Sequence, residues 1–152
     1  MDSLDLQPIG TLPDTNGAVL VELHYAATQK LLYVRWFGNL TSREVMYVAN
    51  EALKLYAQYP TTFLLNDKTH ATGDWVEAMD WLEYEWLPQS MDSGLRAIAY
   101  VFSPDMHNQL ASLEFFERVR AYIPIQLFQE LSSAWQWLRK QGRPPRPVEA
   151  SV

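Results

Sequence analysis

The sequence predicts one α/β domain built around a largely parallel β-sheet. Stretches with the two-residue period of a strand alternate with stretches of helical period along most of the chain, and turn residues separate them. In addition, 48% of the 152 residues are hydrophobic, which is enough to bury a sizeable core. Strands that alternate with helices pair in parallel through right-handed crossovers. We therefore expect four consecutive strand–helix units preceded by one hairpin strand, with the helices mainly on one face of the sheet.

The first two strands are predicted to form an antiparallel hairpin. Residues 1–17 carry several Pro and Gly residues without a sustained period, so we expect a leader segment there and a single domain over residues 18–142. The run Val19 to Tyr25 alternates apolar with partly polar positions, as a strand does. The run Leu31 to Phe37 is rich in β-branched and aromatic residues, and a short polar link joins the two.

A capping box marks the start of the first helix. Thr41 and Glu44 have the spacing at which each side chain bonds a free backbone amide of the first turn, and Pro60 ends the helical period. The run Thr61 to Leu65 then predicts a short buried strand. The polar residues 66–73 predict a loop, which holds the densest group of reactive side chains in the chain.

A second helix is expected after this loop. Asp74 is its predicted N-cap, the helix runs from Trp75 to Trp86, and it stops before Pro88. The apolar run Leu95 to Phe102 predicts the next strand.

Two further helices and one strand complete the predicted order. Ser103 opens a helix whose apolar face is carried by Met106, Leu110 and Leu113. Residues 123–128 contain a proline and predict an edge strand. The final helix begins near Leu131 and ends at Gly142, and residues 143–152 are expected to form a flexible tail.

Composition excludes several function classes. The chain has no cysteine, so a disulfide framework, a thiolate metal site and a cysteine nucleophile are all impossible. The net charge of −6 disfavours binding to nucleic acid and to anionic membranes. The first ten residues lack the pattern of a signal peptide, and no apolar run is long enough to span a membrane. We therefore expect a cytoplasmic protein.

Four stretches resemble the SpoIIAA-like proteins, whose fold is shared by STAS domains and by lipid-binding Sec14-type domains. The stretches are Trp36-Phe37-Gly38-Asn39-Leu40-Thr41, Leu64-Leu65-Asn66-Asp67, residues 94–101 and Ala134-Trp135-Gln136-Trp137-Leu138. The resemblance covers about residues 18–140. It implies a SpoIIAA-like fold and, by analogy, a regulatory or protein-binding role or the binding of a lipid-like ligand.

The resemblance also implies a place for a phosphorylation switch. In anti-sigma-factor antagonists of this kind, a partner kinase phosphorylates the first serine of an Asp-Ser-Ser-Gly loop. The corresponding stretch here is His70-Ala71-Thr72-Gly73, so Ala71 replaces that serine and Thr72 is the remaining candidate acceptor. A phosphate on Thr72 would lie at a helix N-terminus, but Asp67 and Asp74 would repel it.

The polar loop supplies the candidate binding residues, which are Asp67, His70, Thr72 and Asp74. They follow a strand and precede a helix, where α/β sheets commonly bind ligands, although turns and caps require the same residue types. His70 with a neighbouring Asp could form an acid–base pair, but no nucleophile motif accompanies it. The spacing matches no known metal site, and we expect neither a cofactor nor a catalytic centre.

The second helix supplies a candidate interface. Its aromatic residues exceed what one buried face needs, and its carboxylates are typical of a solvated acidic face. We assign the interface to Trp81, Tyr84 and Glu85. The first functional hypothesis is a non-enzymatic regulatory domain that binds a protein partner or itself. The alternatives are a module for a small or lipid-like ligand and, less favoured, an enzyme that uses His70.

Overall fold

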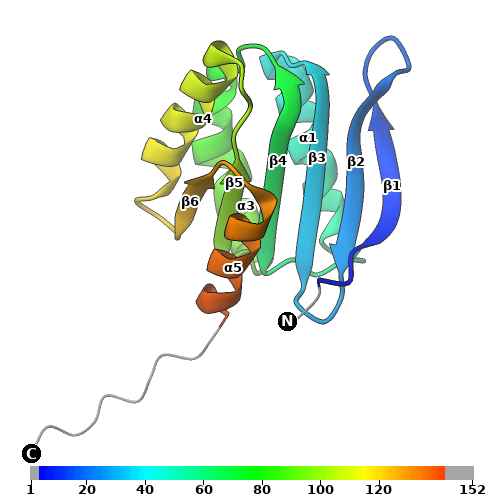
Figure 1. The fold of residues 1–152 in the computed structure, drawn as a ribbon, viewed down its shortest axis with the longest axis vertical. Helices are drawn as coiled ribbons and strands as arrows, with labels where there is room; N and C mark the ends of the chain where they lie inside the picture. Colours follow the sequence, from blue (N-terminus) through cyan, green and yellow to red (C-terminus); the bar gives the residue numbers. More distant parts are fainter. Residues whose placement is uncertain (1–3, 143–152) are drawn as a thin grey trace, which may run out of the picture.

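The computed structural model describes residues 4–142 and shows an α/β fold with one mixed six-stranded sheet. The strands lie in the sheet in the order in which they occur in the chain (Figure 1). They are β1 (Gln7–Pro13), β2 (Val19–Ala26), β3 (Leu31–Asn39), β4 (Phe63–Thr72), β5 (Ala97–Val101) and β6 (Ile125–Phe128). The first three strands pair antiparallel, and β3 to β6 pair in parallel.

The helices are divided unequally between the two faces of this sheet. They are α1 (Ser42–Leu55), a helical segment made of η1 (Val76–Ala78), α2 (Met79–Trp81), η2 (Leu82–Trp86) and α3 (Leu87–Asp92), then α4 (Met106–Val119) and α5 (Leu131–Gln141). Three connections, from β3 to β4, from β4 to β5 and from β5 to β6, each join neighbouring parallel strands. Their right-handed crossovers put the connecting helices, which are α1, the segment η1–α3 and α4, on one face. The last helix, α5, lies on the opposite face (Figure 1). Among residues 4–142, no helix is both long and apolar enough to cross a membrane.

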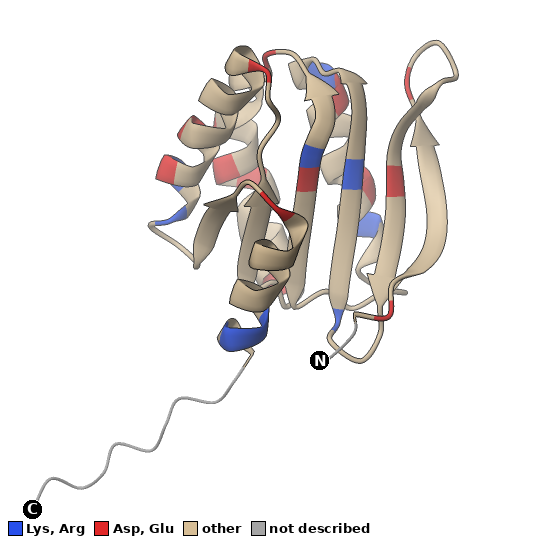
Figure 2. Ribbon diagram, in the orientation of Figure 1, with Lys and Arg blue, Asp and Glu red and all other residues tan. Residues whose placement is uncertain are grey.

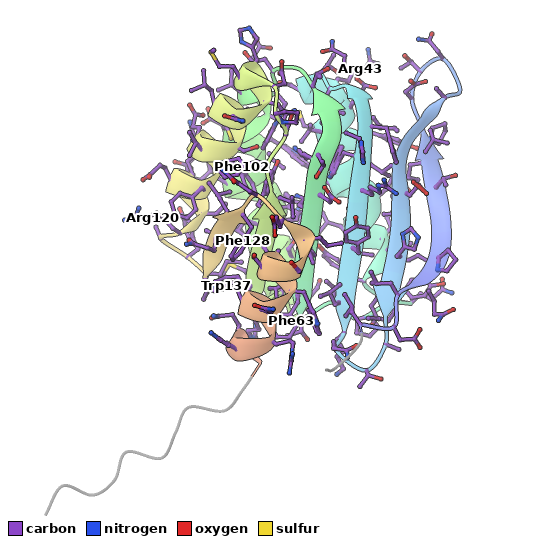
Figure 3. All side chains as sticks on the ribbon, in the orientation of Figure 1. Arg43, Phe63, Phe102, Arg120, Phe128 and Trp137 are labelled. Atoms are coloured by element: carbon purple, nitrogen blue, oxygen red, sulfur yellow. The ribbon has the colours of Figure 1, made fainter. Side chains whose placement is uncertain are left out.

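Each face of the central strands has its own hydrophobic core. The larger core lies between the sheet and the three crossover connections. The smaller one lies under α5, where Phe63 of β4 and Phe128 of β6 face the helix and the Phe128 and Trp137 rings are 5.9 Å apart (Figure 3). Burial on both faces explains why β5 is apolar at every position.

The leader prediction for residues 1–17 is wrong, because the segment contains an edge strand. Residues of β1 pair with β2 from Gln7↔Tyr25 to Pro13↔Val19, with register shifts near Gly10 and Pro13. A strand that pairs on one side only tolerates Pro8 and Pro13, whose missing N–H groups would break a central ladder. Residues 143–152, for which we predict a tail, lie outside the described residues.

The predicted polar loop is also wrong, because residues 66–72 continue the central strand. β4 follows β3 in parallel as far as Asn39↔Thr72, with one register shift opposite Arg35 and Phe37. The strand turns Asp67 and Lys68 to opposite faces of the sheet, and the register shift returns His70 to the face of Asp67, where it contacts Arg35 and Phe37. The continued strand therefore separates Lys68 from its polar neighbours.

Two helix predictions need correction. The second helix does not stop before Pro88: η2 is a π-helical turn, in which the Leu87 N–H bonds to the Leu82 carbonyl, and the helix continues to Asp92. In α4 the predicted apolar face of Met106, Leu110 and Leu113 is exposed. The buried residues of α4 are Asn108, Ala111, Ser112, Phe115 and Val119.

Candidate ligand-binding cavity

The structure places the predicted acid–base pair on the sheet face that α5 only partly covers, with each partner engaged elsewhere. Asp67 is buried and accepts hydrogen bonds from the Tyr33 hydroxyl at 2.5 Å and from the Thr69 N–H at 3.0 Å. His70 is exposed, lies 2.9 Å from an Arg35 nitrogen and stacks on the Phe37 ring. No hydrogen bond between Asp67 and His70 occurs among the described residues.

These residues belong to a charge row that crosses three strands. Glu22 of β2 pairs in register with Arg35 of β3, which pairs with Asp67 of β4, and Figure 2 shows the row as red, blue and red segments. Arg35 Nη1 lies 3.8 Å from Glu22 Oε1. Burial and the bond to Asp67 both raise the pKa of Tyr33, which therefore stays protonated and donates. Arg35 therefore forms an ion pair with Glu22, whereas Asp67 is held by hydrogen bonds from Tyr33 and Thr69.

Thr72 ends β4 and contacts the neighbouring strand β3, whereas Asp74 closes a local turn. The Thr72 hydroxyl lies 3.1 Å from Asn39 Oδ1, and Asp74 Oδ1 accepts the Val76 N–H at 2.9 Å. The four predicted binding residues therefore do not converge on one site. Within residues 4–142, no group of three or more His, Asp or Glu side chains is placed to hold a metal ion.

The predicted interface residues divide between core and surface. Tyr84 is 62% exposed and Glu85 is exposed, whereas Trp81 is half-buried and packs against the larger core. The neighbouring Glu83 binds Arg118 at 3.2 Å and Tyr122 at 2.8 Å, which joins the helical segment to α4 and its C-terminal end.

The most unusual group in the protein is Lys68, which sequence reasoning assigned to the loop. Because β4 continues through it, Lys68 points to the face opposite Asp67 and enters the larger core, where it is 1% exposed. Its Nζ lies 3.5 Å from the ring centroid of Trp75, 4.6 Å from that of Trp36 and 5.3 Å from that of Tyr100. Among residues 4–142, no carboxylate lies within 4.0 Å of this nitrogen.

Two effects oppose each other at Lys68. Each aromatic ring stabilises an ammonium group by roughly 0.5–2 kcal/mol, so the three rings offset part of the several kcal/mol that its removal from water costs. Burial therefore lowers the pKa of Lys68 well below its ordinary value of 10.5. The side chain brings a nucleophilic and basic nitrogen into an apolar environment.

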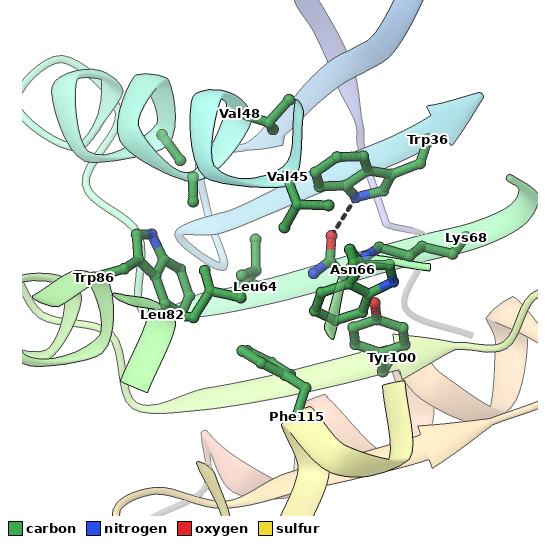
Figure 4. A pocket seen from close by; sticks show the side chains of 13 residues that line it. Trp36, Val45, Val48, Leu64, Asn66, Lys68, Leu82, Trp86, Tyr100 and Phe115 are labelled. Carbon is green, nitrogen blue, oxygen red and sulfur yellow. Dashed lines mark hydrogen bonds between the residues drawn. The ribbon is translucent and has the colours of Figure 1, made fainter. Parts of the chain in front are cut away.

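Lys68 lines a cavity between the sheet and the helices (Figure 4). The centre of a water-sized sphere can move within about 40 Å³ of this cavity. This volume holds roughly three water molecules, or a guest of about four heavy atoms. Its walls are mostly apolar and come from β3, β4, β5, α1, η2 and α4. The lining residues are Trp36, Val45, Val48, Ala49, Ala52, Leu64, Asn66, Lys68, Trp75, Leu82, Trp86, Tyr100 and Phe115.

The polar atoms at the cavity are mainly donors. Trp36 Nε1 donates to Asn66 Oδ1 at 2.6 Å (Figure 4), but the indole N–H groups of Trp75 and Trp86 are buried without an acceptor among the described residues. The Tyr100 hydroxyl faces Ser112 without a hydrogen bond of ordinary geometry. Each buried donor without a partner costs about 1–3 kcal/mol, so a guest that brings an acceptor would recover part of this cost.

The π-helical turn forms one wall of this cavity. Leu82 and Trp86, its first and last residues, both line the space. Such turns insert an extra residue into a helix and occur frequently at functional sites. Sequence reasoning missed the site because it ended the strand at Leu65. The alternation Leu64, Asn66, Lys68 was the available signal, since these residues share one face of a continued strand.

No protein-family model matches the chain, and no curated protein matches it either.

Proposed function

We propose that this protein is a binding module for a small organic molecule, which occupies the cavity between the sheet and the helices. The observation that carries the proposal is a fully buried lysine at the wall of that cavity, without an acidic partner in the part of the chain that the structure describes. Two indole N–H groups without an acceptor among the same residues support it. Buried polar groups that the fold leaves unsatisfied are expensive, and they are typical of functional sites.

The cavity selects its guest by size and polarity. The space favours a molecule of about four heavy atoms, and the apolar walls favour a hydrophobic tail. The free donors favour a guest with one acceptor oxygen. Within a SpoIIAA-like domain, such a guest would act as the signal or cargo of a regulatory protein. The role of Thr72 as a phosphate acceptor stays a separate prediction.

Thermal unfolding with small neutral probes tests the binding function. Propanal, 2-butanone and 1-propanol should each raise Tm with increasing concentration, because a guest that binds only the folded state stabilises it. They should also change the fluorescence of the tryptophans that line the cavity. Ala49→Leu, which fills the cavity from α1, should abolish both effects, whereas the exposed Ala57→Leu should not. Absence of a response to all three probes contradicts the proposal.

A second candidate function is self-association through α4. Met106, Leu110 and Leu113 are 69%, 57% and 43% exposed and follow the spacing i, i+4, i+7, which makes one apolar stripe directed away from the sheet. Exposed apolar stripes mark contact surfaces. We propose a second copy of this chain as the occupant: it carries an identical apolar stripe, and a twofold axis would bring the two stripes together.

Light scattering over a range of concentrations tests this assignment. The protein should form a dimer, and Leu110→Glu should make it monomeric. Leu131→Glu changes a leucine of α5 that is 40% exposed and should leave the dimer intact. A wild-type protein that stays monomeric at high micromolar concentration contradicts the assignment.

A further inference from the structure

The chemistry of the guest follows from the one nucleophilic atom at the cavity wall. We propose that the Lys68 amine captures a small apolar aldehyde or ketone reversibly as an imine. This inference rests on the proposed binding function and names its ligand class. The supporting geometry is the position of Nζ among Trp36, Trp75 and Tyr100 and the adjoining space for a small guest.

The fold keeps this nitrogen available for reaction. A lysine nucleophile must be unprotonated, and an apolar pocket achieves this by disfavouring the ammonium form. Lys68 has no carboxylate nearby that would hold a proton on it, again among residues 4–142. Lys54, by contrast, is exposed and forms an ion pair with Glu51 at 2.9 Å. The two lysines should therefore differ strongly in reactivity at neutral pH.

A carbonyl compound fits the cavity better than a carboxylate does. An anionic guest would have to be desolvated together with a protonated Lys68, and a buried ion pair seldom recovers that cost in apolar surroundings. A neutral carbonyl guest avoids this penalty. Its oxygen can accept from Trp75 Nε1, Trp86 Nε1 or the Tyr100 hydroxyl, which keeps its proton because burial raises the pKa of Tyr100.

The reaction needs no further reagent. The lone pair of Nζ adds to the carbonyl carbon, the C–N bond forms, and the π electrons of the C=O bond move to oxygen. Transfer of a proton from nitrogen to oxygen gives a carbinolamine. Loss of that oxygen as water, with the second amine proton, forms the C=N bond. Nothing is oxidised or reduced, and water from solvent reverses the sequence.

Reductive trapping identifies the lysine that forms an imine. The full-length protein is incubated at pH 7 with propanal and sodium cyanoborohydride, and peptide mass spectrometry measures propylation of Lys30, Lys54, Lys68 and Lys140, which are all the lysines of the chain. We expect Lys68 to be modified at least about tenfold faster than Lys54, because each unit of lowered pKa raises the neutral fraction of the amine about tenfold. Ala49→Leu should remove this preference, and Ala57→Leu should retain it.

Each outcome separates the imine from simple binding. If propanal raises Tm but labels Lys68 no faster than Lys54, the imine is wrong and the binding function stands. If propanal, 2-butanone and 1-propanol all leave Tm unchanged and Lys68 is unlabelled, both proposals fail. If butyrate raises Tm and propanal does not label Lys68, the cavity is a carboxylate site and the imine is wrong.

Discussion

At the scale of single residues, Lys68 is a buried side chain that lowers the free energy of unfolding at neutral pH. A lysine whose charged form is disfavoured in the folded state lowers stability at neutral pH, where the unfolded chain carries the proton in water. An isosteric apolar side chain would pack in the same volume without that cost. The amine at this position therefore contributes nothing to stability at neutral pH, in keeping with the binding role proposed for it.

Replacing Lys68 by Met should change the pH dependence of stability. Between the lowered pKa and 10.5 the unfolded wild type binds one proton more than the folded protein, so its free energy of unfolding rises with pH, by at most about 1.4 kcal/mol per unit. Lys68→Met lacks this contribution. It should be at least as stable as the wild type at pH 7, and its advantage should shrink toward pH 10.

Urea unfolding at several pH values measures this difference. The exposed Lys54→Met is the control and should follow the wild-type profile. Parallel profiles for the wild type and Lys68→Met would show that Lys68 titrates normally in the folded protein.

Gly73 is required by the close approach of two chain segments. It has φ = +98°, and a Cβ atom there would overlap the backbone nitrogen and oxygen of Leu40. Gly73→Ala should therefore lower the free energy of unfolding by about 3 kcal/mol, from backbone strain and overlap together. Gly17 has φ = +85° with no atom within 4 Å of the added Cβ, so Gly17→Ala isolates the strain and should cost about 1 kcal/mol. Equal costs in urea unfolding would contradict this account.

At the scale of secondary-structure elements, the capping box correctly predicts one helix start, whereas two starts predicted from single residues are wrong. The N-cap of α4 is Asp105 instead of Ser103, and that of η1 is Trp75 instead of Asp74. The capping box of α1 is formed by both expected bonds, with Glu44 N donating to Thr41 Oγ1 at 3.3 Å and Thr41 N donating to Glu44 Oε1 at 3.2 Å. The continuation of the second helix past Pro88 needed a π-helical turn, which no short motif announces.

Thr41→Ala should destabilise the protein by about 1 kcal/mol, because the Glu44 N–H in the first turn of α1 loses its acceptor. Ser42→Ala, one residue further on, removes a hydroxyl that does not cap the helix and should change stability by less than about 0.5 kcal/mol. Thermal unfolding of both variants measures the difference. A similar loss for both would show that the cap is not the cause, since alanine itself favours the helix.

Helix α4 buries small and polar residues because it lies close to the end of β4. Asn108 Nδ2 donates to the Thr72 carbonyl at 3.2 Å, and the Ser112 hydroxyl donates to the Asn108 carbonyl at 2.9 Å. Ala111 is buried, and its small side chain lets the helix lie close to the sheet. Phe115 and Val119, on the same side of α4, enter the larger core, so Met106, Leu110 and Leu113 are left on the exposed side.

At the scale of the whole molecule, helices cover both faces of the sheet, and the two faces are covered by different parts of the chain. Three crossover connections cover one face, and α5 covers only the β4–β6 part of the other. Ala134 and Leu138 anchor α5 with no exposed surface. The uncovered remainder of this face carries the partly exposed ion pair of Glu22 and Arg35 and the exposed His70, which keep it compatible with water.

Leu138→Ala should therefore destabilise the whole fold, since the cavity it leaves lies between α5 and the sheet. We expect a loss of about 3 kcal/mol in the free energy of unfolding. Leu131→Ala, at the exposed start of the same helix, should cost less than about 1 kcal/mol. A single unfolding transition for both variants in urea would show that the two cores fold together, and a separate early transition for Leu138→Ala would show that they do not.

The sequence by itself determined the succession of strands and helices from β2 onward, the β2–β3 hairpin and the cap of α1, because these features depend on residues close together in the chain. The tertiary structure decided what depends on distant partners. Residues 66–72 form a strand because β3 offers them a hydrogen-bond ladder, and β1 forms because β2 does the same. That ladder turns Asp67 to one face and Lys68 to the other. Lys68 became a cavity-lining amine only when Trp36, Trp75 and Tyr100, from three separate parts of the chain, surrounded it.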